Sequence, residues 1–293
     1  MSSLKQKSKL FLIKALRRCV LLIPKPLRVY LIYKIPRSFV IMPDNMQLIF
    51  TKYLGDLSVA VDTTYAIERE MLSGKYDIHS SRIIDKFIKK GDYCLDIGAN
   101  IGALSLVMAK KVGATGKVFC FEPGPMTFER LQKNLSLNNG FSKILVLEKS
   151  GLSDKPGSLF WHHHEENPGD ANLSELLEGS GVEVPVITVD SYCEARGVSK
   201  LNFVKIDVES MEYEVIKGGM KTWEKHLPIL YYETLKEFEA YRKEPVFKYI
   251  ENMLGGLGYT FYKLENDISI TQTKYPDLSN NTLALPPIVK SGG

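Results

Sequence analysis

The sequence has few cysteines, and they are scattered along the chain. None of the four belongs to a Cys-x-x-Cys pair, and their spacing is uneven, which argues against a disulfide framework. Cys94 and Cys120 each lie in an apolar run, which predicts two buried thiols of a hydrophobic core. A reducing, cytoplasmic compartment therefore fits the chain better than an oxidising one.

Long apolar runs are also missing, although 44% of the residues are hydrophobic. Near the N-terminus, Lys14, Arg17 and Arg18 interrupt each apolar run before it reaches the ~20 residues of a membrane span or the roughly 7–15 of a signal-peptide core. What remains is a basic amphipathic helix that ends near Pro24 and Pro26. Such a helix can lie on anionic lipid or pack on the domain with its lysines in water, and both alternatives stay open.

Acidic residues are absent before Asp44, whereas ten basic residues precede it. Of the 38 basic residues in the chain, 28 lie in the rest, against all 34 acidic ones, which gives the rest a net charge of −6. A mildly acidic body argues against a broad nucleic-acid-binding face. We therefore predict a basic helical N-terminal arm, residues 1–50, and a domain, residues 51–293, with no nucleic-acid partner.

Internal repeats and low-complexity tracts are absent as well, and from about residue 80 helical and strand patterns alternate. This alternation predicts an α/β fold with a mostly parallel sheet covered on both faces. Ligands of such sheets bind at the carboxyl ends of the strands. The strand-end residues are Asp96, Glu122, Ser150, Asp207 and Glu233.

The glycine turn after the first of these strands, "DIGANIG", lacks the pattern of a pyrophosphate cradle. After Gly98, the later glycine positions of G-x-G-x-x-G hold Asn100 and Ala103, and no P-loop lysine follows Gly102. The spacing present is D-x-G-x-x-x-G. Its leading acid, Asp96, would repel a pyrophosphate and attract a cation.

S-adenosylmethionine has such a cationic end, because it carries an ammonium and a sulfonium. Asp96 can meet the ammonium directly or through water, while Gly98 and Gly102 let backbone N–H groups approach the carboxylate at a helix N-terminus. Glu122, one strand later, would accept bonds from the ribose hydroxyls, and Pro123 would wall the adenine. The predicted cofactor site comprises Asp96, Gly98, Ala99, Asn100, Gly102, Glu122, Pro123 and Ser150.

The motifs "DIGANIG", "FEPGP", "LSD", "VKIDVESMEYEVIKG" and "YYE" follow one another in this order. In this they resemble the FkbM-type family of S-adenosylmethionine-dependent methyltransferases, over roughly residues 72 to 286. The family usually has glycine where this chain has Ser210, which implies a slightly different turn before Glu212. The resemblance implies a class I methyltransferase (Rossmann-like) fold: a doubly wound, seven-stranded sheet, mostly parallel, with an antiparallel last strand. It also implies methyl transfer to oxygen, often of a sugar hydroxyl.

A group of carboxylates follows the strand "NFVKIDV". Asp207 ends that strand, Glu233 ends the next, and Glu209 and Glu212 share a helix face if a helix begins near Val208. Methyl transfer depends mostly on alignment, worth up to ~7–11 kcal/mol, and an alcohol acceptor must also lose its proton.

The predicted catalytic residues are therefore Asp207, as base or acceptor-orienting residue, with Glu209 and Glu233 as its neighbours around the substrate. Glu212 could join this group at the substrate, and a role as a local cap or in a local salt bridge is an equal alternative. Carboxylates can hold Mg²⁺, but no histidine is spaced with them, and no metal is predicted. In "WHHHEE", His162 and His164 would face one way on a strand and His163 the other, so the three cannot converge on one ion.

The sequence thus favours an S-adenosylmethionine-dependent O-methyltransferase, and we expect its acceptor to be a hydroxyl of a glycan or glycolipid sugar. The alternative is a non-catalytic binding module on the same fold that docks on a membrane or a partner through the arm. We expect a cytoplasmic protein, with peripheral membrane contact of the arm as an open alternative.

Overall fold

The computed structural model describes residues 47–54, 56–62, 65, 68, 71, 76–162, 172–174, 181–264, 269–278 and 280–287. The chain divides into two compact units, Met1–Ile78 and His79–Gly293. In the first unit, β1 (Gln47–Tyr53) and β2 (Leu57–Asp62) pair as an antiparallel hairpin. The predicted arm lies outside the described residues apart from residues 47–50, which belong to β1, and its boundary stays a prediction. No described helix has both the length and the apolarity that crossing a bilayer requires.

The second unit is built on a sheet of eight described strands in the order β13-β12-β14-β11-β10-β3-β4-β5. Their bounds are β3 Tyr93–Ile97, β4 Lys117–Phe121, β5 Leu145–Glu148, β10 Phe203–Ile206, β11 Ile229–Glu233, β12 Thr260–Leu264, β13 Ile270–Thr273 and β14 Asn281–Leu285. The five strands from β5 to β11 are parallel, and the last strand, β14, is antiparallel to β11 and β12. The predicted class I arrangement is confirmed. The seven-strand expectation is exceeded by β13, which adds an antiparallel edge to β12.

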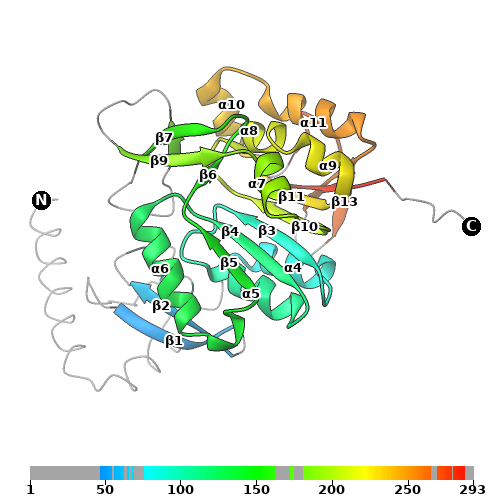
Figure 1. Ribbon diagram of the computed structural model, residues 1–293. Helices are drawn as coiled ribbons and strands as arrows, with labels where there is room; N and C mark the ends of the chain where they lie inside the picture. Colours follow the sequence, from blue (N-terminus) through cyan, green and yellow to red (C-terminus); the bar gives the residue numbers. More distant parts are fainter. Residues whose placement is uncertain are drawn as a thin grey trace, which may run out of the picture. The chain divides into compact units, whose positions relative to one another are not determined.

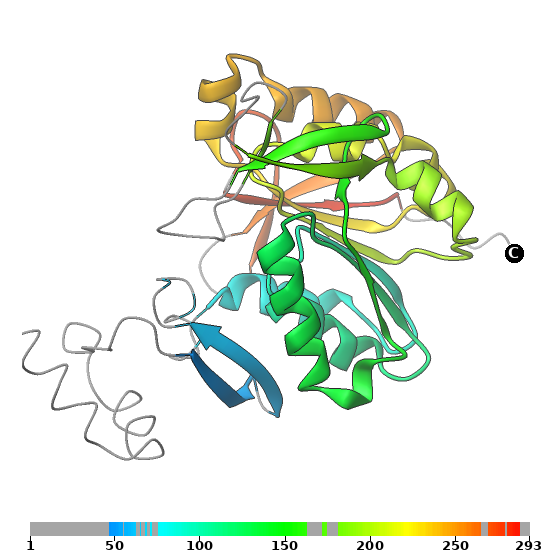
Figure 2. The ribbon, with the colours of Figure 1, turned by 60° about the vertical axis from the view of Figure 1, so that its left-hand side comes forward.

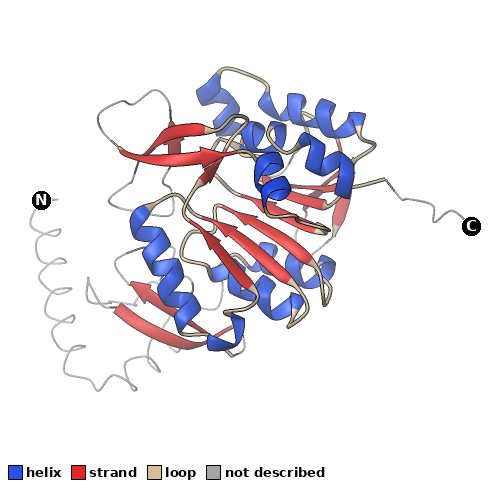
Figure 3. Ribbon diagram, in the orientation of Figure 1, coloured by secondary structure: helices blue, strands red, loops and turns tan. Residues whose placement is uncertain are grey.

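Helices cover both faces of this sheet, with α4, α5 and α6 on one side and α7, α8, α9 and α11 on the other (Figures 1 and 3). The helix bounds are α4 Ile78–Phe87, α5 Ala103–Val112, α6 Pro125–Ser136, α7 Val189–Ala195, α8 Glu212–Lys217, α9 Met220–His226, α10 Lys236–Arg242 and α11 Val246–Gly256, with a short 3₁₀ turn at Asn139–Phe141. The central strands are mostly apolar on both faces because both faces are covered, and the buried charged residues among them are Asp96 on β3 and Lys205 on β10. Cys94 and Cys120 are fully buried thiols in this core, as predicted.

A smaller sheet is inserted between β5 and α7, in the order β6 (Gly151–Leu152), β9 (Val182–Ile187), β7 (Gly157–His162) and β8 (Asn172–Ser174). The β7–β9 pair lies on the same side of the central sheet as α8 (Figure 2). Its buried apolar side chains pack against Met211, immediately before α8; they are Leu159, Trp161, Val184 and Val186. His162 ends β7 and is buried. His163 and His164 lie outside the described residues, so the predicted alternation of the three histidines stays a prediction.

Candidate functional site

The turn between β3 and α5 is shaped by two glycines in the left-handed region. Gly98 has φ 78° and Gly102 has φ 84°, values that side chains make costly. A Cβ on Gly98 would lie 1.8 Å from the carbonyl oxygen of Asp207. Asn100, with φ 49°, takes the same conformation, which asparagine tolerates better than most residues. The turn is therefore packed directly against the end of β10.

Several N–H groups of this turn are already bonded within the protein. Gly98 and Ala99 donate to the carbonyl oxygen of Phe121 at 3.0 and 2.9 Å, and Gly102 donates to Ala99 at 2.9 Å. Gly102 is also the N-cap of α5, where it offers no side chain to accept the first N–H groups of the helix. These first-turn N–H groups, more than those of the two glycines, are the candidate donors to a ligand carboxylate.

Glu122 joins the turn to the loop that follows β4. Its carboxylate accepts hydrogen bonds from the N–H of Asn100 at 2.8 Å, the N–H of Gly124 at 2.9 Å and the hydroxyl of Thr127 at 2.6 Å. Burial raises the pKa of Glu122, and the three donors partly offset that effect. The side chain is thus fixed at the predicted ribose position, while its contact with ribose stays a prediction.

The other predicted cofactor residues lie at the same edge of the sheet. Pro123 follows β4 and Ser150 follows β5, and both are half-buried. Trp161 is not among the predicted residues, yet its ring lies so close to Gly124 that a Cβ on Gly124 would meet it at 2.5 Å. The glycine in "FEPGP" and the large aromatic in "WHHHEE" were the available signals, but sequence alone does not bring them together.

Asp96 is enclosed by the protein, with no exposed surface. The hydroxyl of Ser105 on α5 donates to Oδ2 at 2.6 Å, and the Lys205 ammonium lies 3.5 Å from Oδ1. Burial raises the pKa of Asp96, whereas Lys205 and Ser105 act in the opposite direction. The predicted contact of Asp96 with a ligand ammonium stays a prediction.

Lys205 is a second residue of this edge that was not among the predicted site residues. It lies on β10 and is only 5% exposed. Its ammonium is 3.1 Å from Asp207 Oδ2 and donates to the carbonyl oxygen of Gly98 at 3.0 Å. The signal was a lysine inside the otherwise apolar strand "NFVKIDV", since a charge buried in a strand requires partners.

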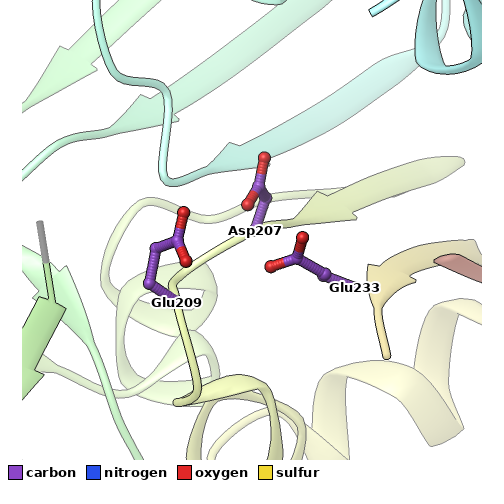
Figure 4. A group of neighbouring side chains, drawn as sticks. All are labelled: Asp207, Glu209 and Glu233. Atoms are coloured by element: carbon purple, nitrogen blue, oxygen red, sulfur yellow. The ribbon is translucent and has the colours of Figure 1, made fainter. Parts of the chain in front are cut away.

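The three predicted catalytic carboxylates come together, and their side chains point toward one another (Figure 4). Oxygens of Asp207, Glu209 and Glu233 all lie within 4.8 Å of one another. The Asp207 side chain is 41% exposed, so a ligand can reach it. Glu233 Oε2 is buried without a hydrogen-bond partner among the described residues. Burial, together with the negative charges of Asp207 and Glu209, raises the pKa of Glu233 well above its ordinary value.

The turn that carries Glu209 differs from the one expected. The helix does not begin near Val208 but at Glu212, and Glu209 and Ser210 both have left-handed backbones, with φ 51° and 87°. Glu209 and Glu212 therefore do not share a helix face, because two left-handed residues cannot continue a right-handed helix. Ser210 keeps a conformation that suits the family's glycine instead of producing a different turn.

Two contacts hold this turn in place. Arg242 on α10 donates to the carbonyl oxygen of Ser210 at 2.9 Å and forms a bidentate pair with Glu214. Glu212 is 1% exposed and accepts the N–H of Val208 at 3.1 Å, so it caps the turn locally. Burial raises the pKa of Glu212 to about 8.

The carboxylate spacing would also suit a divalent cation. However, Asp207 already has an ammonium as its counter-ion, and acidic groups often cluster without a metal. The absence of a metal stays a prediction.

The geometry defines a class I methyltransferase fold with a ligand edge at the carboxyl ends of β3, β4, β10 and β11. A family model described as the methyltransferase FkbM domain matches residues 96–261, more than half of the chain. The chain therefore belongs to the FkbM methyltransferase family, as its motifs predicted. This membership confirms S-adenosylmethionine as the cofactor.

Several curated proteins are similar to this chain. The hexuronic acid methyltransferase AglP of Haloferax volcanii is 32% identical over 50% of this chain and 57% of that protein. The 2-O-methyltransferase NoeI of Sinorhizobium fredii is 25% identical over 48% and 63%, respectively. The 31-O-demethyl-FK506 methyltransferase FkbM of Streptomyces tacrolimicus is 25% identical over 45% and 60%. The chain thus spans about three fifths of the length of these relatives.

Among solved structures, a methyltransferase FkbM from Methylobacillus flagellatus aligns with 75% of this chain and 52% of its own, at 15% identity and a TM-score of 0.44. An S-adenosylmethionine-dependent O-methyltransferase from Thermotoga maritima aligns with 84% and 79%, at 14% identity and a TM-score of 0.43.

Proposed function

We propose that this chain is an S-adenosylmethionine-dependent O-methyltransferase that methylates a hydroxyl group of a sugar in a glycan or glycolipid. The observation that carries the proposal is the contact between Gly98 of the cofactor turn and the Asp207 backbone. It sets the cofactor side and the three carboxylates at one edge of the sheet. Alignment of an acceptor with the reactive methyl group is the main requirement of this reaction.

The three carboxylates have different roles at the acceptor. S-adenosylmethionine supplies the methyl group as an electrophile when it is bound. Asp207 is paired with Lys205, which supports an orienting role, in which it accepts a hydrogen bond from the acceptor hydroxyl. Glu233 has an oxygen without a hydrogen-bond partner among the described residues, and its raised pKa increases its affinity for the hydroxyl proton over that of an ordinary glutamate. Glu209 completes the polar wall around the acceptor.

The choice of oxygen and of a sugar is supported by the names of the relatives. One of them is a hexuronic acid methyltransferase, and two are named for methylation at a numbered oxygen. Three carboxylates within 4.8 Å offer several acceptor positions for the adjacent hydroxyls of a sugar ring.

The proposal is tested with the purified full chain, labelled S-adenosylmethionine and a panel of oligosaccharides with and without uronic acids, followed by mass spectrometry. We expect one sugar class to gain a methyl group on oxygen. The Asp207→Asn variant should bind the cofactor with similar affinity and transfer methyl groups at least about a hundredfold more slowly. Cofactor binding without transfer to any acceptor, including fractions of a cell extract, would favour the non-catalytic binding module instead.

Membrane contact through the basic arm rests on the sequence alone and is a separate proposal. The ten cations before Asp44 would be attracted to anionic lipid, which would hold the enzyme beside lipid-linked glycans. Flotation with anionic liposomes tests this, because equal binding with and without residues 1–37 would exclude the arm as the anchor.

A further inference from the structure

Lys205 is a buried lysine at the centre of the sheet. It lies directly opposite Asp96 in the register of β10 and β3, so the two side chains leave the same face of the sheet. Lysine is almost never this deeply buried unless it is paired. Here the ammonium has three oxygen partners, on Asp96, Gly98 and Asp207, at 3.5, 3.0 and 3.1 Å.

These partners belong to the two halves of the proposed site. Asp96 and Gly98 form the cofactor turn, whereas Asp207 belongs to the carboxylate cluster. The backbones of Gly98 and Asp207 are also in close contact, so a shift of one half must displace the other. Lys205 thus bonds to both halves at the point where they meet.

The two negative charges of Asp96 and Asp207 require a positive charge between them. The negative charge of Asp207 raises the pKa of the buried Asp96, and the ammonium between them lowers it. Without the ammonium, the buried Asp96 carboxylate would face the carboxylate of the half-exposed Asp207 with no counter-charge between them, which favours the protonated form of Asp96. The titratable groups that Lys205 faces on adjoining strands and strand ends are Asp96, Cys120, Glu122, Asp207, Tyr231 and Glu233.

We propose that Lys205 is a positioning residue that keeps Asp96 charged and holds Asp207 in place, and thereby couples cofactor binding to orientation of the acceptor. The orientation part rests on the proposed function, whereas the charge-holding part does not. If only the aliphatic stem of Lys205 mattered, methionine would replace it with little loss of stability. If the ammonium is needed, the same substitution destabilises the protein.

The first test needs no acceptor and no cofactor. It compares the urea unfolding of the wild type, Lys205→Met and Lys205→Met/Asp96→Asn at pH 5 and pH 8. In Lys205→Met the folded-state pKa of Asp96 rises further above its unfolded value, so the loss of stability should be greater at pH 8 than at pH 5. Removal of the Asp96 charge in the double variant should restore part of the stability at pH 8.

The second test measures the affinity for S-adenosylmethionine and for S-adenosylhomocysteine by calorimetry between pH 5 and pH 7, below the ordinary pKa of ~7.7–8.0 of their α-amino group. Wild-type affinity should change little over this range. In Lys205→Met the affinity for S-adenosylmethionine should be lower, and it should fall by about tenfold for each pH unit below the raised carboxyl pKa. Lys217→Met is the matched control, because Lys217 is paired with Asp154 at 2.8 Å on the surface, and it should behave as the wild type.

The two proposals can fail separately. A wild type that binds no S-adenosylmethionine sinks the proposed function, but the unfolding test still decides the charge-holding role of Lys205. Equal losses of stability at both pH values, no rescue by Asp96→Asn, or failure of both variants to fold would reduce Lys205 to a structural residue and overturn the inference.

Discussion

Gly98 and Asp207 are 109 positions apart in the chain, yet no side-chain atom fits between them, because a Cβ on Gly98 would lie 1.8 Å from the Asp207 carbonyl oxygen. The turn at Gly98 and the carboxylate cluster of Asp207, Glu209 and Glu233 therefore share one backbone contact. A displacement of the backbone at either residue is expected to displace the other.

Gly98→Ala should lower the free energy of unfolding by at least ~2 kcal/mol, since the new Cβ clashes with backbone and the φ of 78° is unfavourable for alanine. Cofactor affinity should fall with it. Urea unfolding and calorimetry measure the two effects. Gly157→Ala is the control: a Cβ there has no neighbour within 4 Å, and its effect should stay within ~0.5 kcal/mol. Similar values for both variants would contradict the tight contact.

Glu233 should give methyl transfer a requirement for alkaline pH. Because its pKa is raised, the protonated form persists well above the ~4.3 of an ordinary glutamate, and this form cannot accept the acceptor's proton. The rate constant kcat/KM should therefore fall as the pH falls below the raised pKa. Glu233→Gln should remove this dependence and lower kcat by roughly a hundredfold or more. Glu224→Gln, on the exposed side of α9, should leave the profile unchanged. An unshifted profile in Glu233→Gln would exclude Glu233 as the proton acceptor.

Glu212 should make the protein less stable as the pH rises. Its folded-state pKa of about 8 lies above the ordinary value, so the folded state loses stability between the two pKa values as the pH increases. Glu212→Gln keeps an acceptor for the Val208 N–H and removes the charge. The variant should therefore gain stability relative to the wild type at pH 8.5 but not at pH 4, by a few kcal/mol at most. Parallel stability curves for the two proteins would contradict this.

Ser210→Gly should raise the free energy of unfolding by about 0.5–1 kcal/mol. A serine with φ 87° is strained, and the relief exceeds the extra entropy that glycine adds to the unfolded chain. The Arg242 bond to the Ser210 carbonyl is made by the backbone, so it survives the change. Ser210→Val is the opposite control and should be destabilising. A loss of stability in Ser210→Gly, measured by thermal or urea unfolding, would mean that the serine hydroxyl has a role of its own.

The sequence was most informative where one local pattern determines both conformation and chemistry. The turn at Gly98 and Gly102, the apolar strands and the acids that end them could all be placed, because a strand end, a glycine turn and a helix start are short-range features. The convergence of Asp207 and Glu233 followed from a general rule, since neighbouring parallel strands end at the same edge.

Longer-range features were not predictable in this way. In the sequence Lys205 is only one polar residue in an apolar strand, and its partner Asp96 becomes evident only from the register of β10 and β3. Trp161 reaches Gly124 only through the fold of the inserted sheet. The helical spacing of Glu209 and Glu212 was misleading because Ser210 adopts a glycine-like backbone that its identity does not reveal.

The inserted sheet contacts both sides of the site. Trp161 stands against Gly124 in the loop after β4, while the apolar cluster to which Trp161 belongs packs on Met211, next to the turn that carries Glu209. A change in this sheet can therefore displace both the loop after β4 and the turn that carries Glu209. Changes in acceptor preference that arise in residues 151–187 should therefore be accompanied by changes in cofactor affinity, so that new specificity through this insert evolves only where both are retained.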